Sequence, residues 1–247
     1  MECILADLNL LEVKTTVSKD KMTGVFVIEP LSPGYGVTVG NTLRRILLAS
    51  LEGYAINSIK IGGIDHEYST IKAVKEDAVD LVLNLKTMRV KLTGTEEATL
   101  KLSVKGPKKV TAEDFGKNAS VELIDKSHYL CTVEKGGKLD VEINIDKGRG
   151  YVPVEKKAEK KLPIGTIVVD SIYTPVKKVR FDVENARVGG MTNYNKLTVE
   201  ITTDGTISPA EALKTAAQIM NEHLQVIIDA CSVSTKTKVK TASKKAK

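Results

Sequence analysis

The stretch that decides the fold is residues 30–53, which read PLSPGYGVTVGNTLRRILLASLEG. Its first half is expected to be irregular, because prolines lack a backbone donor and glycines adopt angles that other residues avoid. Its second half predicts a helix that Thr38 caps at the start and Gly53 ends in a left-handed conformation. The apolar residues that support this helix recur at helical spacing: Val39, Leu43, Ile46, Leu47, Leu48 and Leu51.

A glycine turn before a helix can also bind phosphate. The spacing of Gly34, Gly36 and Gly40 matches neither the P-loop nor the dinucleotide fingerprint, so phosphate binding is not favoured. The helix instead carries two adjacent arginines, Arg44 and Arg45. Neighbouring residues on a helix point about 100° apart, so the two arginines cannot serve the same neighbour. Arg45 is expected to reach outward, where it contacts a partner protein, pairs with Glu52 or stays solvated.

Composition limits the class of protein. A chain of 247 residues holds one large domain or two small ones, and it can bury a core without disulfides. Cys3, Cys131 and Cys231 are odd in number and far apart, which favours reduced thiols in a cytoplasmic protein over disulfides or a zinc site. The sequence opens with an acid and no secretory pattern, and no apolar run approaches the length of a membrane span.

The net charge of +6 comes from the end of the chain. Residues 234–247 contain six lysines and no acid, and the remaining basic residues equal the 31 acidic ones. A basic surface for nucleic acid is therefore expected only in this segment, which predicts a flexible tail with weak, nonspecific nucleic-acid contact.

The rest of the sequence predicts an α+β fold, in which an antiparallel sheet with two main helices is interrupted by a mostly β insert. Apolar and polar residues alternate most cleanly at 99–105 and 139–145, as in half-exposed antiparallel strands. These strands place the insert at about 56–170, between two parts of a discontinuous domain at 1–55 and 171–233. Other expected elements are strands at 10–17, 23–28, 55–61, 121–124, 128–133, 166–173, 178–183 and 196–202, and a helix at 75–86.

The second main helix is predicted from Ser208 to about Cys231, because Ser208, Pro209 and Glu211 form a strong start signal. Its apolar arc is about twice the ~100° that a helix on one sheet needs. Either the helix is buried deep in one core, or one stripe covers its own sheet and the other meets another subunit. The first stripe is Leu213, Ala217, Met220, Leu224, Ile227 and Ile228, and the second is Ala212, Ile219, Val226 and Ala230.

The sequence gives little support for a catalytic role. Asp65-His66-Glu67 looks like an acid–base or metal cluster, but three consecutive residues point in different directions and a surface loop is favoured. His128 and His223 are interpreted as packing or hydrogen-bonding residues. The known catalytic spacings are not found, so we predict no catalytic residues, no metal ligands and no cofactor. A nucleic-acid-binding protein acting through its tail and an unrelated cytosolic enzyme remain the rival interpretations.

Six motifs occur along the chain, at residues 30–53, 66–70, 76–86, 148–153, 173–176 and 204–207. In sequence and in order they resemble the N-terminal assembly domain of bacterial RNA polymerase alpha subunits, over roughly residues 8–232. The resemblance implies a non-catalytic scaffold in which two copies pair and recruit the beta and beta-prime subunits, which hold the catalytic centre. Family members usually continue into a C-terminal DNA-binding domain, which this sequence is expected to lack.

The resemblance also implies two surfaces. Two copies would pair through the first and last helices, using Tyr35, Val39, Leu43, Ile46, Ser50, Ile219, Val226, Ile227 and Ala230. The large subunits would contact Arg44, Arg45, Leu48, His66, Glu67, Tyr68, Ser69, Thr70, Gly148, Arg149, Gly150 and Tyr151, the last four in an exposed loop. Within this set, Arg45 is implied to be a beta-contacting position.

Overall fold

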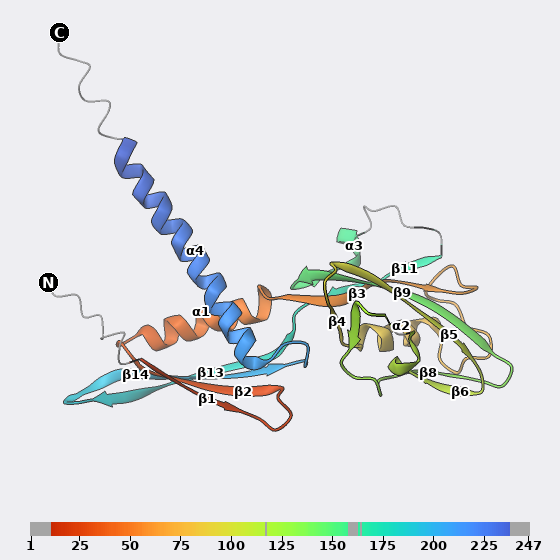
Figure 1. Cartoon of the computed structure of the whole chain (residues 1–247), viewed down its shortest axis with the longest axis horizontal. Coiled ribbons are helices and arrows are strands. Elements are labelled where there is room, and N and C mark those ends of the chain that lie inside the picture. The colour runs from red at the N-terminus through yellow and green to blue at the C-terminus, as the bar shows by residue number, and fades with distance from the viewer. Residues whose placement is uncertain (1–10, 117, 158–162, 164, 238–247) are drawn as a thin grey trace, which may run out of the picture.

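The computed structural model describes residues 11–116, 118–157, 163 and 165–237, and Figure 1 shows two lobes side by side. One lobe holds a sheet with the two long helices, and the other holds the insert. In chain order the elements are β1 (Glu12–Val17), β2 (Thr23–Leu31), α1 (Tyr35–Ala49), β3 (Glu52–Ile61), α2 (Ala78–Thr87), β4 (Val90–Leu92), β5 (Glu97–Lys105), β6 (Lys108–Thr111), the 3-10 turn η2 (Ala112–Asp114), β7 (Val121–Leu123), β8 (Tyr129–Val133), β9 (Lys138–Arg149), β10 (Tyr151–Val152), α3 (Val154–Lys157), β11 (Thr166–Val168), β12 (Ser171–Ile172), β13 (Val176–Val188), β14 (Met191–Thr203) and α4 (Pro209–Thr237).

The first lobe is an antiparallel sheet of order β1-β2-β14-β13, with α1 lying along one face of it (Figure 1). Its core contains Leu43 and Leu47 from α1, packed with apolar residues of the sheet. Glycine lets the helix approach closely: a Cβ at Gly36 or Gly40 would lie 2.7 Å from a side-chain carbon of β13. The close contact explains why a helix of this sequence tolerates two glycines despite their entropic cost.

The start of α1 differs from the predicted one. The helix begins at Tyr35, with Gly34 as its left-handed cap at a φ of 84°, so Thr38 lies inside the first turn. The free amides at the helix start are satisfied from a distant strand, because Asn195 Oδ1 accepts hydrogen bonds from the amides of Gly34 (2.8 Å) and Gly36 (3.2 Å). A sequence pattern cannot reveal a cap that is 159 residues away.

The expected left-handed end at Gly53 is also wrong. The helix ends at Ala49, and Gly53 lies within β3, where a Cβ would come within 1.8 Å of the carbonyl oxygen of Tyr173. Glycine is required there by a close backbone approach, not by a turn. The irregular segment expected from Pro30 to the helix start is shorter than predicted, because β2 runs through Pro30 to Leu31 and α1 already begins at Tyr35.

The insert is a second layered unit. Its sheet has the order β11-β3-β9-β5, and α2 and the strand pairs β4-β7 and β6-β8 complete it. The predicted alternation in β5 and β9 is confirmed: their apolar residues are buried in one cluster that spans residues 56–169. The other buried cluster combines residues 26–51 with 176–216. The predicted mixed α+β class, with a mostly β segment in the middle, is therefore confirmed.

Several element boundaries differ. The strand expected at 166–173 is two short strands, β11 and β12, which belong to different sheets. The strands expected at 178–183 and 196–202 extend into the long β13-β14 hairpin, which turns at Gly189 and Gly190. The helix expected at 75–86 starts at Ala78, because the Asp77 carboxylate caps it by accepting the amide of Asp80 at 2.8 Å. Parts of the strand expected at 10–17 and of the tail lie outside the described residues.

The start of α4 was predicted correctly. The Ser208 hydroxyl accepts the Glu211 amide at 3.3 Å, and the Glu211 carboxylate accepts the Ser208 hydroxyl at 2.9 Å. The helix continues past the expected end at Cys231 to Thr237, since extending a helix that is already formed costs little. Within the described ranges, no helix combines the length and apolarity that crossing a membrane requires.

Candidate interaction surfaces

Among the described residues, the second half of α4 is not covered by the sheet of its own lobe. Ala212 and Ala216 are fully buried against the sheet, whereas every side chain from Asn221 to Cys231 is exposed, and Figure 1 shows the helix projecting away from the sheet. The interpretation of a helix buried deep in one core is therefore wrong. What remains is an exposed apolar segment, here called the α4 apolar segment, made of Leu224, Val226, Ile227 and Ile228.

The residues that were expected to pair two copies differ in exposure. Tyr35, Val226, Ile227 and Ala230 are exposed, while Val39, Ile46, Ser50 and Ile219 are partly buried. Leu43 is only 4% exposed and packs in the core of its own chain, where it holds α1 against the sheet. Exposed Val37 and Leu224 lie on the same two helices, and sequence reasoning left both out of the expected set.

The two arginines of α1 are exposed. Within the part of the chain that the structure describes, neither side chain makes a hydrogen bond or an ion pair. Arg45 therefore does not pair with Glu52, whose carboxylate is held by Lys147 and Arg149 at 2.6 Å each. Leu48, the third expected contact residue on this helix, is partly buried against the core of its own lobe.

Arg149 does not lie in a loop, as the sequence suggested, because it is the last residue of β9 and faces Glu52 of β3 in the strand register. Hydrogen bonds from Lys147 and then from Arg149 lower the pKa of Glu52 below its usual range. The turn itself is confined to Gly150, which has a φ of 64°. At this end of the insert the exposed Arg149 side chain is therefore ion-paired with Glu52 across two strand ends.

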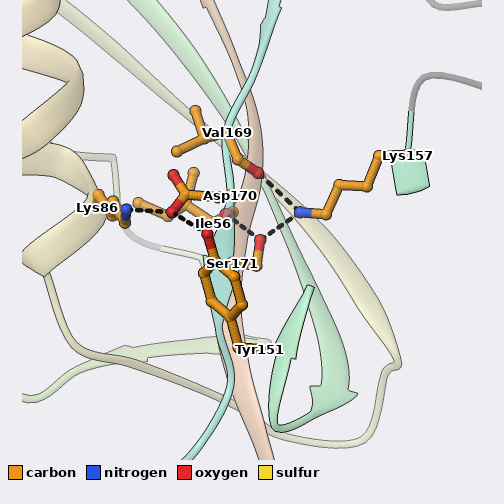
Figure 2. A network of polar contacts seen from close by, with 7 residues as sticks. All are labelled: Ile56, Lys86, Tyr151, Lys157, Val169, Asp170 and Ser171. Atoms are coloured by element: carbon orange, nitrogen blue, oxygen red, sulfur yellow. Dashed lines mark hydrogen bonds and ion pairs between the residues drawn. The ribbon is translucent and has the colours of Figure 1, made fainter. Parts of the chain in front are cut away.

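Tyr151 is fixed by a polar network that joins α2, β10 and β12 (Figure 2). Its hydroxyl donates to Asp170 Oδ2 at 3.0 Å, and Lys86 Nζ donates to the same oxygen at 2.5 Å. The Lys86 hydrogen bond is the main cause that lowers the pKa of Asp170, and the Tyr151 hydrogen bond adds to it. The Tyr151 ring remains exposed, so the network orients a rigid aromatic side chain toward solvent.

A second part of the network holds the short helix α3. Lys157 Nζ donates to the carbonyl of Val169 at 2.8 Å and to the Ser171 hydroxyl, which in turn donates to the carbonyl of Ile56 at 2.8 Å (Figure 2). Burial lowers the pKa of Lys157. Sequence reasoning missed these residues because the network joins single polar side chains from separate elements, and no local spacing marks such a set.

The segment from His66 to Thr70 forms a surface loop, as the sequence favoured. Tyr68 is 81% exposed, and the Ser69 hydroxyl lies 3.0 Å from His66 Nδ1. Among the described residues, no group of three His, Cys, Asp or Glu side chains could hold a metal ion. His128 is a hydrogen-bonding residue, with its Nε2 2.9 Å from the carbonyl of Asn84, whereas His223 is exposed on α4.

Comparison with known proteins agrees with the fold. The family model described as the RNA polymerase Rpb3/RpoA insert domain matches residues 59–174. The chain is 50% identical over 212 residues to the DNA-directed RNA polymerase subunit alpha of Alkaliphilus metalliredigens, a match covering 86% of this chain and 67% of that protein. The same-named subunits of Clostridium botulinum (strain Hall) and Clostridium acetobutylicum are 49% and 47% identical over 85% of this chain and 67% of their own lengths. The chain therefore belongs to the family of DNA-directed RNA polymerase alpha subunits.

Proposed function

We propose that this chain is the non-catalytic scaffold of its polymerase, which pairs with a second copy of itself and recruits the beta and beta-prime subunits. The observation that carries the proposal is the α4 apolar segment. Burying one such side chain fully is worth roughly 1.5–3 kcal/mol, so an exposed run of them favours a protein partner. A second copy fits best, because an identical helix brings an equally apolar surface to a symmetric contact.

The proposed pairing surface combines α4 with the exposed side of α1. Val226, Ile227 and Ala230 of α4 and Tyr35 of α1 would make the direct contacts. Val39, Ile46, Ser50 and Ile219 would lie at its edge, since they are partly buried already. Leu43 is assigned a supporting role only, because its side chain is enclosed by its own chain.

The proposed recruiting surface begins with Arg44 and Arg45, beside Leu48. Exposed arginines that have no partner among the described residues suit a protein interface, where arginine is enriched among the residues that dominate binding energy. The loop His66–Thr70 and the end of the insert, Gly148–Tyr151, would add the other contacts, with the fixed Tyr151 ring as an anchor.

The proposal also assigns the parts of the chain. Residues 1–55 and 171–233 would form the dimerisation domain, residues 56–170 the insert that faces the large subunits, and residues 234–247 a lysine-rich tail. The tail would contact nucleic acid weakly and without sequence preference, and the scaffold would work in the cytoplasm. No catalytic residue or cofactor is assigned, because nucleotide addition would belong to the large subunits.

The test is beta-subunit binding by Arg45→Ala. Truncating one partner of an interfacial charge pair costs about 2–5 kcal/mol, so the dissociation constant should rise roughly thirtyfold or more. Lys126→Ala removes another exposed cation outside the proposed surface and should leave binding unchanged. The melting temperature and dimer mass of Arg45→Ala should match the parent. Normal beta binding by this variant would refute the recruiting role, and a collapsed dimer would show that Arg45 is structural.

A further inference from the structure

The two lobes meet at the turn between β14 and α4. Asp204 lies in this turn, and its charged side chain is only 5% exposed. Its Oδ1 atom accepts hydrogen bonds from the amide (3.0 Å) and the hydroxyl (2.5 Å) of Thr206. Its Oδ2 atom lies 3.9 Å from Nε of Arg89, which stands between α2 and β4 of the insert. A nearly buried carboxylate of one lobe is therefore ion-paired with a cation of the other.

Close packing surrounds this ion pair. A Cβ at Gly205 would lie 3.1 Å from Cγ2 of Ile124 in the insert and 3.3 Å from Cε of Met22 in the other lobe. The Ile124 amide donates to the Arg89 carbonyl at 3.1 Å, so the two insert residues form one hydrogen-bonded unit. The Asp204 amide donates to the carbonyl of Pro175 at 3.0 Å, which fixes the turn to the sheet lobe.

Next to this contact the lobes separate. A groove of about 620 Å³ runs between α4 and the insert, lined on one side by Lys214 and Glu222 and on the other by Lys91 and Lys147. Thr206 and Lys91, each two residues from a member of the ion pair, also line this groove. A rotation of the insert about the two chain connections between the lobes, residues 50–51 and 173–175, would change the width of the groove and would pull Arg89 away from Asp204.

We propose that Asp204 and Arg89 form a clamp that holds the two lobes at one angle, so that the chain presents its surfaces as a single rigid body. Separating the pair would leave a buried carboxylate without its cation, which is strongly unfavourable. The clamp therefore opposes rotation of the insert, and both residues act as positioning residues. It is a property of the free chain, so it stands or fails independently of large-subunit recruitment.

The angle can be measured by pulsed electron paramagnetic resonance between one spin label on each lobe. Lys109→Cys in the insert and Lys178→Cys on β13 give exposed sites. Cys3 and Cys231 are replaced by serine, while Cys131 is fully buried and stays unlabelled. The labelled full chain is diluted with excess unlabelled chain, so that distances between copies do not contribute. The parent should give one narrow distance distribution.

Arg89→Gln should at least double the width of this distribution, and Asp204→Asn, which keeps an oxygen for Thr206, should do the same. Arg89→Lys retains the charge and should restore most of the narrow distribution. Lys101→Gln is the control, since it breaks an exposed ion pair with Glu142 (3.5 Å) inside the insert and should change nothing. Unchanged widths for both Arg89→Gln and Asp204→Asn would overturn the clamp, as would equal broadening by the control.

Discussion

Replacing Val226 and Ile227 together by aspartate should separate the two copies without unfolding either of them. Both residues are largely exposed in the single chain, at 67% and 59%, so the change removes little packing within it. Ile219 is a poorer choice, although it belongs to the same expected surface, because it packs against its own core. The variant therefore tests pairing separately from folding.

The magnitude follows from the exposed area. Fully burying a valine or isoleucine side chain contributes roughly 1.5–3 kcal/mol, so about 1 kcal/mol is a low figure for a side chain that is about two-thirds exposed before pairing. A symmetric dimer contains each residue twice, which gives a loss of about 4 kcal/mol over four side chains. That loss corresponds to a rise of about a thousandfold in the dimer dissociation constant. The cost of burying four aspartates adds to it.

Sedimentation equilibrium over a range of concentrations measures this constant, and circular dichroism follows the fold. Asn221→Asp adds one negative charge, half of what the double variant adds, at an exposed position near the start of the exposed half of the helix, and it should leave the constant within a few-fold of the parent. A double variant that dimerises as tightly as the parent would refute the assignment of the α4 apolar segment. A variant that loses its helical signal would show that this segment is needed for folding.

Two further predictions concern the single chain. Gly53→Ala should lower the free energy of unfolding by about 1–3 kcal/mol or more, since the new Cβ would lie 1.8 Å from the Tyr173 carbonyl oxygen. Gly190→Ala, with open space around it, should leave the stability unchanged. Equal melting temperatures for the two variants would contradict this account of the packing. The lowered pKa of Asp170 means that its carboxylate stabilises the fold above the ordinary carboxyl pKa of about 4, and that this contribution disappears as the pH falls through the lowered folded-state value. Asp170→Asn should therefore lose less free energy of unfolding than the parent between about pH 5 and pH 2 in urea titrations, and identical pH profiles would exclude the contribution.

Local patterns predicted the parts of this fold that depend on local physics. The alternation in β5 and β9 reports which face of a strand is buried, and the Ser208–Glu211 signal reports hydrogen bonds within one helical turn. The two errors at the ends of α1 involve distant partners. Asn195 caps α1 from another strand, and the backbone near Tyr173 determines why residue 53 is glycine.

For the candidate surfaces, too, features set by local sequence were predicted and features set by distant partners were not. The wide apolar arc of the last helix predicted a segment that its own sheet cannot cover, and the structure leaves that segment exposed. The expectation that Arg149 lies in a loop failed because it pairs with Glu52 in the register of β3 and β9, which only the assembled sheet reveals. Arg45 was correctly expected to reach outward, since its direction depends only on helical geometry.

The most direct test of the scaffold is the stoichiometry of its complex with the beta subunit. Light scattering after size exclusion should give the free chain a mass of twice 26.8 kDa, and the complex should contain two copies of the chain for each beta subunit. Adding beta-prime should then convert this complex into a larger one without releasing either copy. A complex with one copy per beta subunit, or no complex at all, would contradict the proposal that a dimer of this chain recruits the large subunits.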